Sequence, residues 1–181
     1  MKHCVICTLN TPVGLITVCE YHKGVVRVDF DNGTSALNDI DIKIVGRDRR
    51  FFEDNTPDIP TKKLFFDSAM QLCEYFVGMR NHFDLPVVVS AKEGTFKREV
   101  LEQLNIIPFG QTVSYMELAT KAKKPKAYRA AATVIANNKT PIILPCHRVI
   151  NSNGKVGKFI AGTEVKQKLL NIEQKYHLGS G

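Results

Sequence analysis

The chain has 181 residues, of which 44% are hydrophobic and 24% charged, and its formal net charge is +7 at pH 7. This length supports one sizeable hydrophobic core or two small ones. The apolar runs are far shorter than the roughly 20 residues of a membrane span, and the start of the chain lacks the apolar core of a secretory signal. Because the five cysteines are an odd number, free thiols in a reducing compartment are expected, and the protein is expected to be intracellular.

The first half of the chain, residues 1–90, is expected to form a small α/β domain. Residues 3–30 contain short β-branched runs separated by the turn-like stretches NTPVG and HKG, which is typical of strands. Residues 31–63 are polar and irregular, as in loops. A helix is expected at residues 64–77, with Met70 and Leu72 on its apolar face.

The second half, residues 91–181, is expected to be mainly α-helical. One helix is predicted at residues 96–104 and another at residues 163–175. Between them, Ser114 and Glu117 have the spacing of a capping box, so a short helix begins there. A further helix with Pro125 in its first turn follows a brief connection. Two short helices around a tight turn, the second of them basic, describe a helix-turn-helix.

The net positive charge is confined to the second half. From residue 92 onward, 15 lysines and arginines stand against six glutamates, a net charge of +9, whereas residues 1–91 carry −2. A solvated basic face is the simpler explanation. The segregation nevertheless favours a polyanionic partner such as nucleic acid.

The second helix of the predicted helix-turn-helix is rich in alanine. Ala127, Ala130, Ala131 and Ala132 leave much of its surface almost without side chains, and Arg129 projects among them. Such a pattern is most often a packing face. In a DNA-binding helix it would also let the backbone approach nucleic acid closely while one arginine reaches into it.

The apolar run TPIILP is expected to be a buried strand that delivers Cys146 to an edge or a pocket. A lone cysteine is most often an inert buried thiol. Here, however, it is followed by His147 and Arg148, groups of the kind that lower the pKa of a thiol and make it a nucleophile.

An ordered set of motifs carries a resemblance to a known family. IPFGQTVSYMELA, PKAYRAA, PCHRV, GKVGKFIAG and KQKLLNIE follow one another within residues 96–174. In this order and spacing they resemble the O6-alkylguanine-DNA alkyltransferase family, whose smaller α/β domain is matched mainly by TPVGLITV. The resemblance implies an N-terminal α/β domain and a mainly α C-terminal domain with a helix-turn-helix.

The resemblance also implies a function. The protein would flip O6-alkylguanine out of double-stranded DNA and move its alkyl group irreversibly to its own cysteine, one group per molecule. Whether O4-alkylthymine is also repaired stays open. A monomer that needs no cofactor and no membrane is implied, in the nucleus of a eukaryote or the cytoplasm of a prokaryote.

Individual roles follow from the resemblance. Cys146 would be the acceptor, and His147 would take its proton through a water held by Glu173. Asn138 would form a hydrogen bond to the loop that carries the cysteine, and Tyr115 would donate a proton towards guanine N3. Arg129 would fill the position that the extruded base leaves in the DNA base stack. The remaining DNA contacts implied are Tyr115, Ser114, Lys126, Ala127 and Ala130, and the implied pocket residues are Pro141, Val149, Gly157, Phe159 and Ile160.

Two stretches depart from the family pattern. Arg129–Ala132 reads Arg-Ala-Ala-Ala where the family usually has Arg-Ala-Val-Gly, and Lys158–Ala161 replaces a common Asn-Tyr-Ser-Gly. Ile160 and Ala161 would narrow the pocket. Tolerance for bulky alkyl groups and for benzylguanine inhibitors is therefore open.

The sequence allows three alternative interpretations. A DNA-binding regulator with an inert cysteine would account for the helix-turn-helix and the charge. A cysteine hydrolase would need an oxyanion hole and a separate, oriented histidine. A zinc site at Cys4, Cys7, Cys19 and His22 has formally suitable spacing, but the residues lie in strand sequence, where positions three apart point to opposite faces. Zinc is thus considered possible but not expected.

Overall fold

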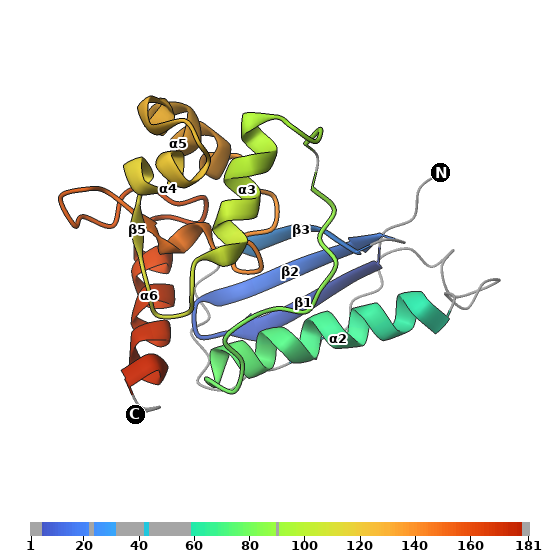
Figure 1. The fold of residues 1–181 in the computed structure, drawn as a ribbon. Helices are drawn as coiled ribbons and strands as arrows, with labels where there is room; N and C mark the ends of the chain where they lie inside the picture. Colours follow the sequence, from blue (N-terminus) through green and yellow to red (C-terminus); the bar gives the residue numbers. More distant parts are fainter. Residues whose placement is uncertain (1–4, 22–23, 32–41, 44–58, 90, 179–181) are drawn as a thin grey trace. The chain divides into compact units, whose positions relative to one another are not determined.

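The computed structural model describes residues 5–21, 24–31, 42–43, 59–89 and 91–178 (Figure 1). The chain divides into two compact units, Met1–Val88 and Val89–Gly181. The sequence-based division after residue 90 lies two residues further on. Within the described residues, no helix is long and apolar enough to cross a membrane. Most of the loop expected at residues 31–63 lies outside the described part.

The first unit is built on an antiparallel sheet of four strands in the order β3-β2-β1-β4. Strands β1 (Val5–Thr11) and β2 (Gly14–Tyr21) form a hairpin in which Thr11 lies opposite Gly14. The Thr11 hydroxyl donates a hydrogen bond of 2.6 Å to the Gly14 carbonyl and so closes the turn. Strands β3 (Gly24–Asp31) and β4 (Ile42–Lys43) flank this hairpin.

One face of the sheet is buried by α2 (Ile59–Phe76), which runs along it (Figure 1). Alternate residues of β1 and β2 point into this core because side chains of a strand alternate between faces. The buried apolar residues here are Cys7, Leu9, Ile16, Val18, Ala69, Leu72, Tyr75 and Phe76. The prediction of Met70 on the apolar face was wrong, since 40% of its surface is exposed. The helix also begins five residues earlier than predicted, because Pro60 is tolerated in a first helical turn.

Two of the zinc candidates can be placed in this sheet. Cys7 lies opposite Val18 and Cys19 lies opposite Ile6, so the two thiols point to opposite faces and do not form one site together. Cys4 and His22 lie outside the described residues. Among the residues that are described, no group of three His, Cys, Asp or Glu side chains has the arrangement of a metal site.

A carboxyl group is buried in the core of this unit. Glu20 of β2 is 1% exposed, accepts a hydrogen bond from the Ser68 hydroxyl of α2, and has no partner for Oε2 among the described residues. Burial raises the pKa of Glu20 to about 7 from an ordinary 4.5, with the Ser68 bond opposing and the Asp67 charge adding to the rise. Folding therefore favours the protonated form.

Neutralising Glu20 should stabilise the protein at alkaline pH. Because the folded pKa lies above the unfolded one, the stability of the wild type is full below pH 4.5 and falls as pH rises towards 7. Glu20→Gln is expected to raise the free energy of unfolding by about 2 kcal/mol at pH 8 and by little near pH 4.5. Urea unfolding at both pH values measures this. An equal change at both pH values would contradict it.

The second unit is mainly helical, as predicted. The helix α3 (Phe96–Ile106) is capped by Thr95, whose hydroxyl accepts from the Arg98 amide, and α4 (Tyr115–Lys121) begins with the predicted capping box of Ser114 and Glu117. The helix expected from Pro125 is in two pieces, a 3-10 turn η1 (Pro125–Ala127) and α5 (Tyr128–Ala136). The last helix, α6 (Thr163–Leu178), runs three residues beyond its predicted end.

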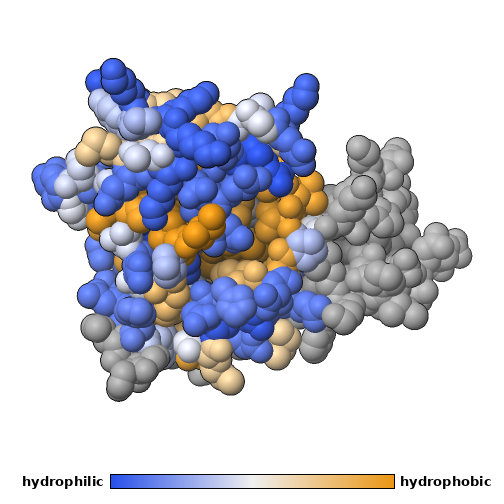
Figure 2. All heavy atoms as spheres, in the orientation of Figure 1, coloured by the Kyte–Doolittle hydropathy of each residue, from blue (hydrophilic) through white to orange (hydrophobic). Residues whose placement is uncertain are grey.

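Helices α4 and α5 form a helix-turn-helix that packs on α3. The buried residues at this junction are Val100, Leu101, Leu104, Leu118, Ala119, Ala131 and Ile135. A two-stranded parallel sheet joins β5 (Val113–Ser114) to β6 (Val149–Ile150) and so links the start of α4 to the segment after Cys146. In the view of Figure 2, hydrophilic residues cover much of the surface over α4 and α5.

Candidate active site and nucleic-acid interface

The segment before Cys146 is a buried turn, so the prediction of a strand there was wrong. Ile142 has φ of 72°, and the Leu144 amide donates to the Thr140 carbonyl at 2.9 Å. Prolines at both ends of the run lack the N–H that a central strand needs, which explains the outcome. Cys146 instead begins a 3-10 turn, η2 (Cys146–Arg148), and is 2% exposed.

Asn138 ties the end of α5 to this turn. Its amide nitrogen donates to the Leu144 carbonyl at 2.9 Å, and its amide oxygen accepts from the Thr140 amide at 3.1 Å. Asn138 is 3% exposed, so both bonds are shielded from water. The contact expected between the helix-turn-helix and the cysteine loop is therefore present.

Glu173 of α6 is the centre of a buried charged cluster. Its Oε1 lies 2.7 Å from Nε2 of His147, and both of its oxygens accept hydrogen bonds from Arg148 at 2.9–3.1 Å. The Gly110 amide donates to Oε2 at 2.9 Å. Glu173 thus bonds directly to the imidazole and holds it in a fixed orientation.

Burial and charge set the protonation of this cluster. Burial alone would raise the pKa of Glu173, but hydrogen bonds from His147 and Arg148 and the charge of Arg148 lower it to about 2, so the carboxylate is ionised. Burial, together with the charges of Arg148 and Lys166, lowers the pKa of His147, and the hydrogen bond and charge of Glu173 oppose this only in part. A neutral imidazole next to a thiol can accept its proton. Arg148 also donates to the Ile107 carbonyl at 2.6 Å, which holds it as a structural cation.

Cys146 itself is held as a thiol in the free protein. Burial raises its pKa to about 11, although hydrogen bonding from Asn138, the charge of Lys166 and the amides of Cys146 and His147 all favour the thiolate. These groups are arranged around the sulfur before any substrate binds. They would stabilise negative charge on sulfur at the moment of reaction.

Lys166 is a residue that the sequence analysis missed. It is fully buried, its Nζ donates to the Val149 carbonyl at 2.5 Å, and it lies 5.9 Å from the centre of the Tyr115 ring. Burial lowers its pKa to about 8, and Cys146 opposes this change. A signal was present, because Lys166 stands three residues before Leu169 and seven before Glu173, the spacing of one helix face.

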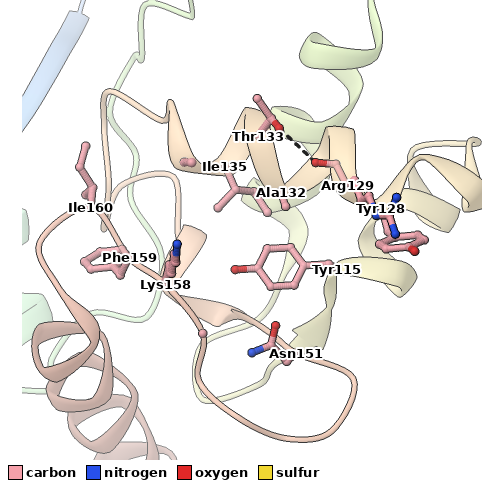
Figure 3. Close-up of a pocket in the computed structure, with 12 residues that line it drawn as sticks. Tyr115, Tyr128, Arg129, Ala132, Thr133, Ile135, Asn151, Lys158, Phe159 and Ile160 are labelled. Carbon is pink, nitrogen blue, oxygen red and sulfur yellow. Dashed lines mark hydrogen bonds between the residues drawn. The ribbon is translucent and has the colours of Figure 1, made fainter.

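A cavity of about 790 Å³ opens between α5 and the loop before α6 (Figure 3). Tyr115 points into it from α4, and Arg129 lies on its rim at the start of α5. Burial, and to a lesser extent the charge of Cys146, raises the pKa of Tyr115. Of the predicted site residues, those lining the cavity are Tyr115, Arg129, Gly157, Phe159 and Ile160.

The other predicted residues, Cys146 among them, are not part of the lining of this cavity. Pro141 and Val149 are buried, and the Ser114 hydroxyl accepts a bond from the Glu117 amide within the capping box. Ala130 and Lys126 are exposed and Ala127 is half-buried, so they remain accessible. Ala131 is fully buried, in agreement with the packing-face interpretation of these alanines. Ile160 is 53% exposed, whereas Ala161 is 9% exposed.

A helix-turn-helix whose second helix is fixed to a buried cysteine, histidine and glutamate defines a DNA-binding domain with a built-in nucleophile. Residues 95–175 match the family model described as "6-O-methylguanine DNA methyltransferase, DNA binding domain", and residues 5–89 match its "ribonuclease-like domain". The chain belongs to the 6-O-methylguanine DNA methyltransferase family. The resemblance noted in the sequence is thereby confirmed.

Curated relatives and solved structures agree with this assignment. A methylated-DNA--protein-cysteine methyltransferase of Methanosarcina barkeri is 37% identical over 92% of this chain and 94% of its own length. The constitutive enzyme of that name from Bacillus subtilis is 34% identical over 92% and 93%. The crystal structure of Mycobacterium tuberculosis OGT in complex with DNA has a TM-score of 0.72 at 28% identity, covering 93% of this chain and 92% of that one.

Proposed function

We propose that this protein repairs O6-alkylguanine in double-stranded DNA by taking the alkyl group onto Cys146, which is consumed. The observation that carries the proposal is the buried Cys146, adjacent to His147 and tied through Asn138 to the DNA-binding helix. A regulator with an inert cysteine would need none of these groups around the sulfur. A hydrolase would not need the cysteine to be fixed to a DNA-binding helix.

The chemistry is a single displacement at carbon. Cys146 gives its proton to the neutral imidazole of His147, and the sulfur attacks the alkyl carbon on guanine O6. The new C–S bond forms as the C–O6 bond breaks, and its electron pair passes to the guanine, which takes a proton at N3 from Tyr115. Lys166 and Asn138 offset the charge on sulfur during the step. The thioether that remains has no route to hydrolysis here, so each molecule reacts once.

DNA binding is assigned to the exposed side of the helix-turn-helix. Exposed lysines follow the turn from α4 to α5, at positions 121, 123, 124 and 126. Such side chains neutralise phosphates without reading sequence. When the damaged base turns outward, Arg129 would occupy the position that this base leaves in the base stack of the DNA. The volume of the cavity is within the range of small-molecule sites.

The remaining expectations extend this proposal. All groups that the displacement needs are side chains of the second unit, so we expect a monomer that requires no metal for transfer. Because its substrate is DNA, we expect it in the nucleus of a eukaryote or the cytoplasm of a prokaryote. Repair of O4-alkylthymine and tolerance for bulky alkyl groups stay open. Both are to be tested by substituting Phe159 and Ile160, which form a wall of the cavity.

The proposal is tested by counting repaired lesions. With excess duplex DNA carrying O6-methylguanine, we expect loss of the lesion to stop at one per wild-type molecule. Cys146→Ser should bind the same duplex with similar affinity and repair none, because a serine hydroxyl is far less readily ionised than a thiol. Repair beyond one lesion per molecule, or repair by Cys146→Ser, would refute the proposal.

A further inference from the structure

Tyr128 places an exposed aromatic ring at the start of the presumed DNA-binding helix. It is the first residue of α5 and is 42% exposed. The guanidinium carbon of Arg129 lies 5.7 Å from the centre of the ring, within the range of a cation–π contact. Both side chains lie on the rim of the cavity, as Figure 3 shows.

This pair is held mainly by its own contact. In the described part of the chain, neither side chain has a further hydrogen bond or ion pair, and the Arg129 backbone is fixed through its carbonyl, which accepts from the Thr133 hydroxyl at 3.2 Å. An arginine without a partner samples many rotamers, and this freedom is lost on binding. The ring limits that freedom beforehand because the guanidinium favours its face.

The neighbours of Tyr128 make the ring prominent. Ala127 precedes it and Ala130 follows Arg129, so its sequence neighbours other than Arg129 have small side chains. Flat side chains that project from a small-residue surface can wedge against the bases and sugars of a widened minor groove. Aromatic rings also stack on bases without regard to sequence.

We propose that Tyr128 is a positioning residue for base extrusion, forming with Arg129 a two-part wedge. The ring supports the guanidinium from the protein side, so that Arg129 is already oriented towards the gap that the extruded nucleotide leaves. This inference rests on the proposed function, since it assigns Tyr128 to the DNA step of that reaction. It assigns Tyr128 no part in the transfer of the alkyl group.

The test compares a substrate from which the base must be extruded with one that needs no extrusion. Methyl transfer from duplex DNA requires the wedge, whereas transfer from the free base O6-methylguanine does not. Tyr128→Ala is expected to slow duplex repair about tenfold, the scale of one aromatic stacking contact, and to leave the free-base rate unchanged. Tyr128→Phe keeps the ring and should retain the wild-type rate on both substrates.

A double-mutant cycle with Arg129→Ala then tests the coupling. If Tyr128 acts through Arg129, adding Tyr128→Ala to Arg129→Ala should slow duplex repair no further. Independent effects that multiply, or faster repair by Tyr128→Ala, would overturn the inference, and equal slowing on the free base would show a merely structural effect. Failure of the wild type to react with either substrate would instead refute the proposed function.

Discussion

Replacing Glu173 with glutamine is expected to lower the free energy of unfolding at pH 7 by about 3 kcal/mol, because it leaves the buried Arg148 without its counter-charge. The side chain of Glu173 is 1% exposed and that of Arg148 is 6% exposed, so water cannot replace the lost partner. The glutamine keeps the shape of the side chain, and a loss of packing does not contribute. His147 loses its carboxylate at the same time, so alkyl transfer should also slow.

The pH dependence separates this charge effect from other causes. Since the pKa of Glu173 is lowered to about 2 from 4.5, its contribution to stability is present above pH 4.5 and is lost as pH falls towards 2. The difference between wild type and Glu173→Gln in denaturant unfolding should therefore shrink below pH 4.5. Glu164→Gln, at an exposed carboxylate in the first turn of the same helix, should change stability little. A difference between wild type and Glu173→Gln that is constant from pH 7 to 3 would contradict this account.

Replacing Lys166 with methionine is expected to slow methyl transfer at neutral pH at least tenfold. The charge of Lys166 lowers the pKa of Cys146, and each unit by which that pKa rises reduces the thiolate fraction tenfold. Methionine has a similar volume and removes a buried ammonium, so the protein should fold. It also removes the bond to the Val149 carbonyl.

The rate of transfer from pH 6 to 9 provides the measurement. In Lys166→Met the rate should rise more steeply with pH and approach the wild-type rate at the alkaline end. The matched control is Lys168→Met, which removes a lysine that is exposed on the same helix. If the two variants behave alike, the charge of Lys166 does not act on the thiol.

Local signals in the sequence predicted much of the fold. The capping box of Ser114 and Glu117 located the start of α4, and the hairpin followed from β-branched runs around NTPVG. The prediction of a strand before Cys146 was wrong because it used the apolar character of the stretch alone. TPIILP is as apolar as a buried strand, yet its prolines and the left-handed Ile142 make it a turn. For the alanines of α5 the sequence left a packing face and a bare surface both open, and the burial of Ala131 depends on how α5 packs.

The site was predictable where residues are adjacent and less so where the fold brings them together. Cys146, His147 and Arg148 are consecutive, and the motif order linked them to Asn138 and Glu173. The direct bond between Glu173 and His147 depends on how α6 packs against η2, which no motif states. Lys166 was overlooked because lysines are rarely buried, so a lysine in an amphipathic helix is normally assigned to the solvent side.

The central claim, that Cys146 accepts the alkyl group, is tested most directly by mass. The wild type is incubated with excess duplex DNA carrying one O6-methylguanine per molecule, and its intact mass is measured before and after digestion. We expect a gain of one methyl group, about 14 Da, on the peptide that contains Cys146 and on no other of the five cysteines. No gain in mass, or a methyl group on a different cysteine, would contradict the account.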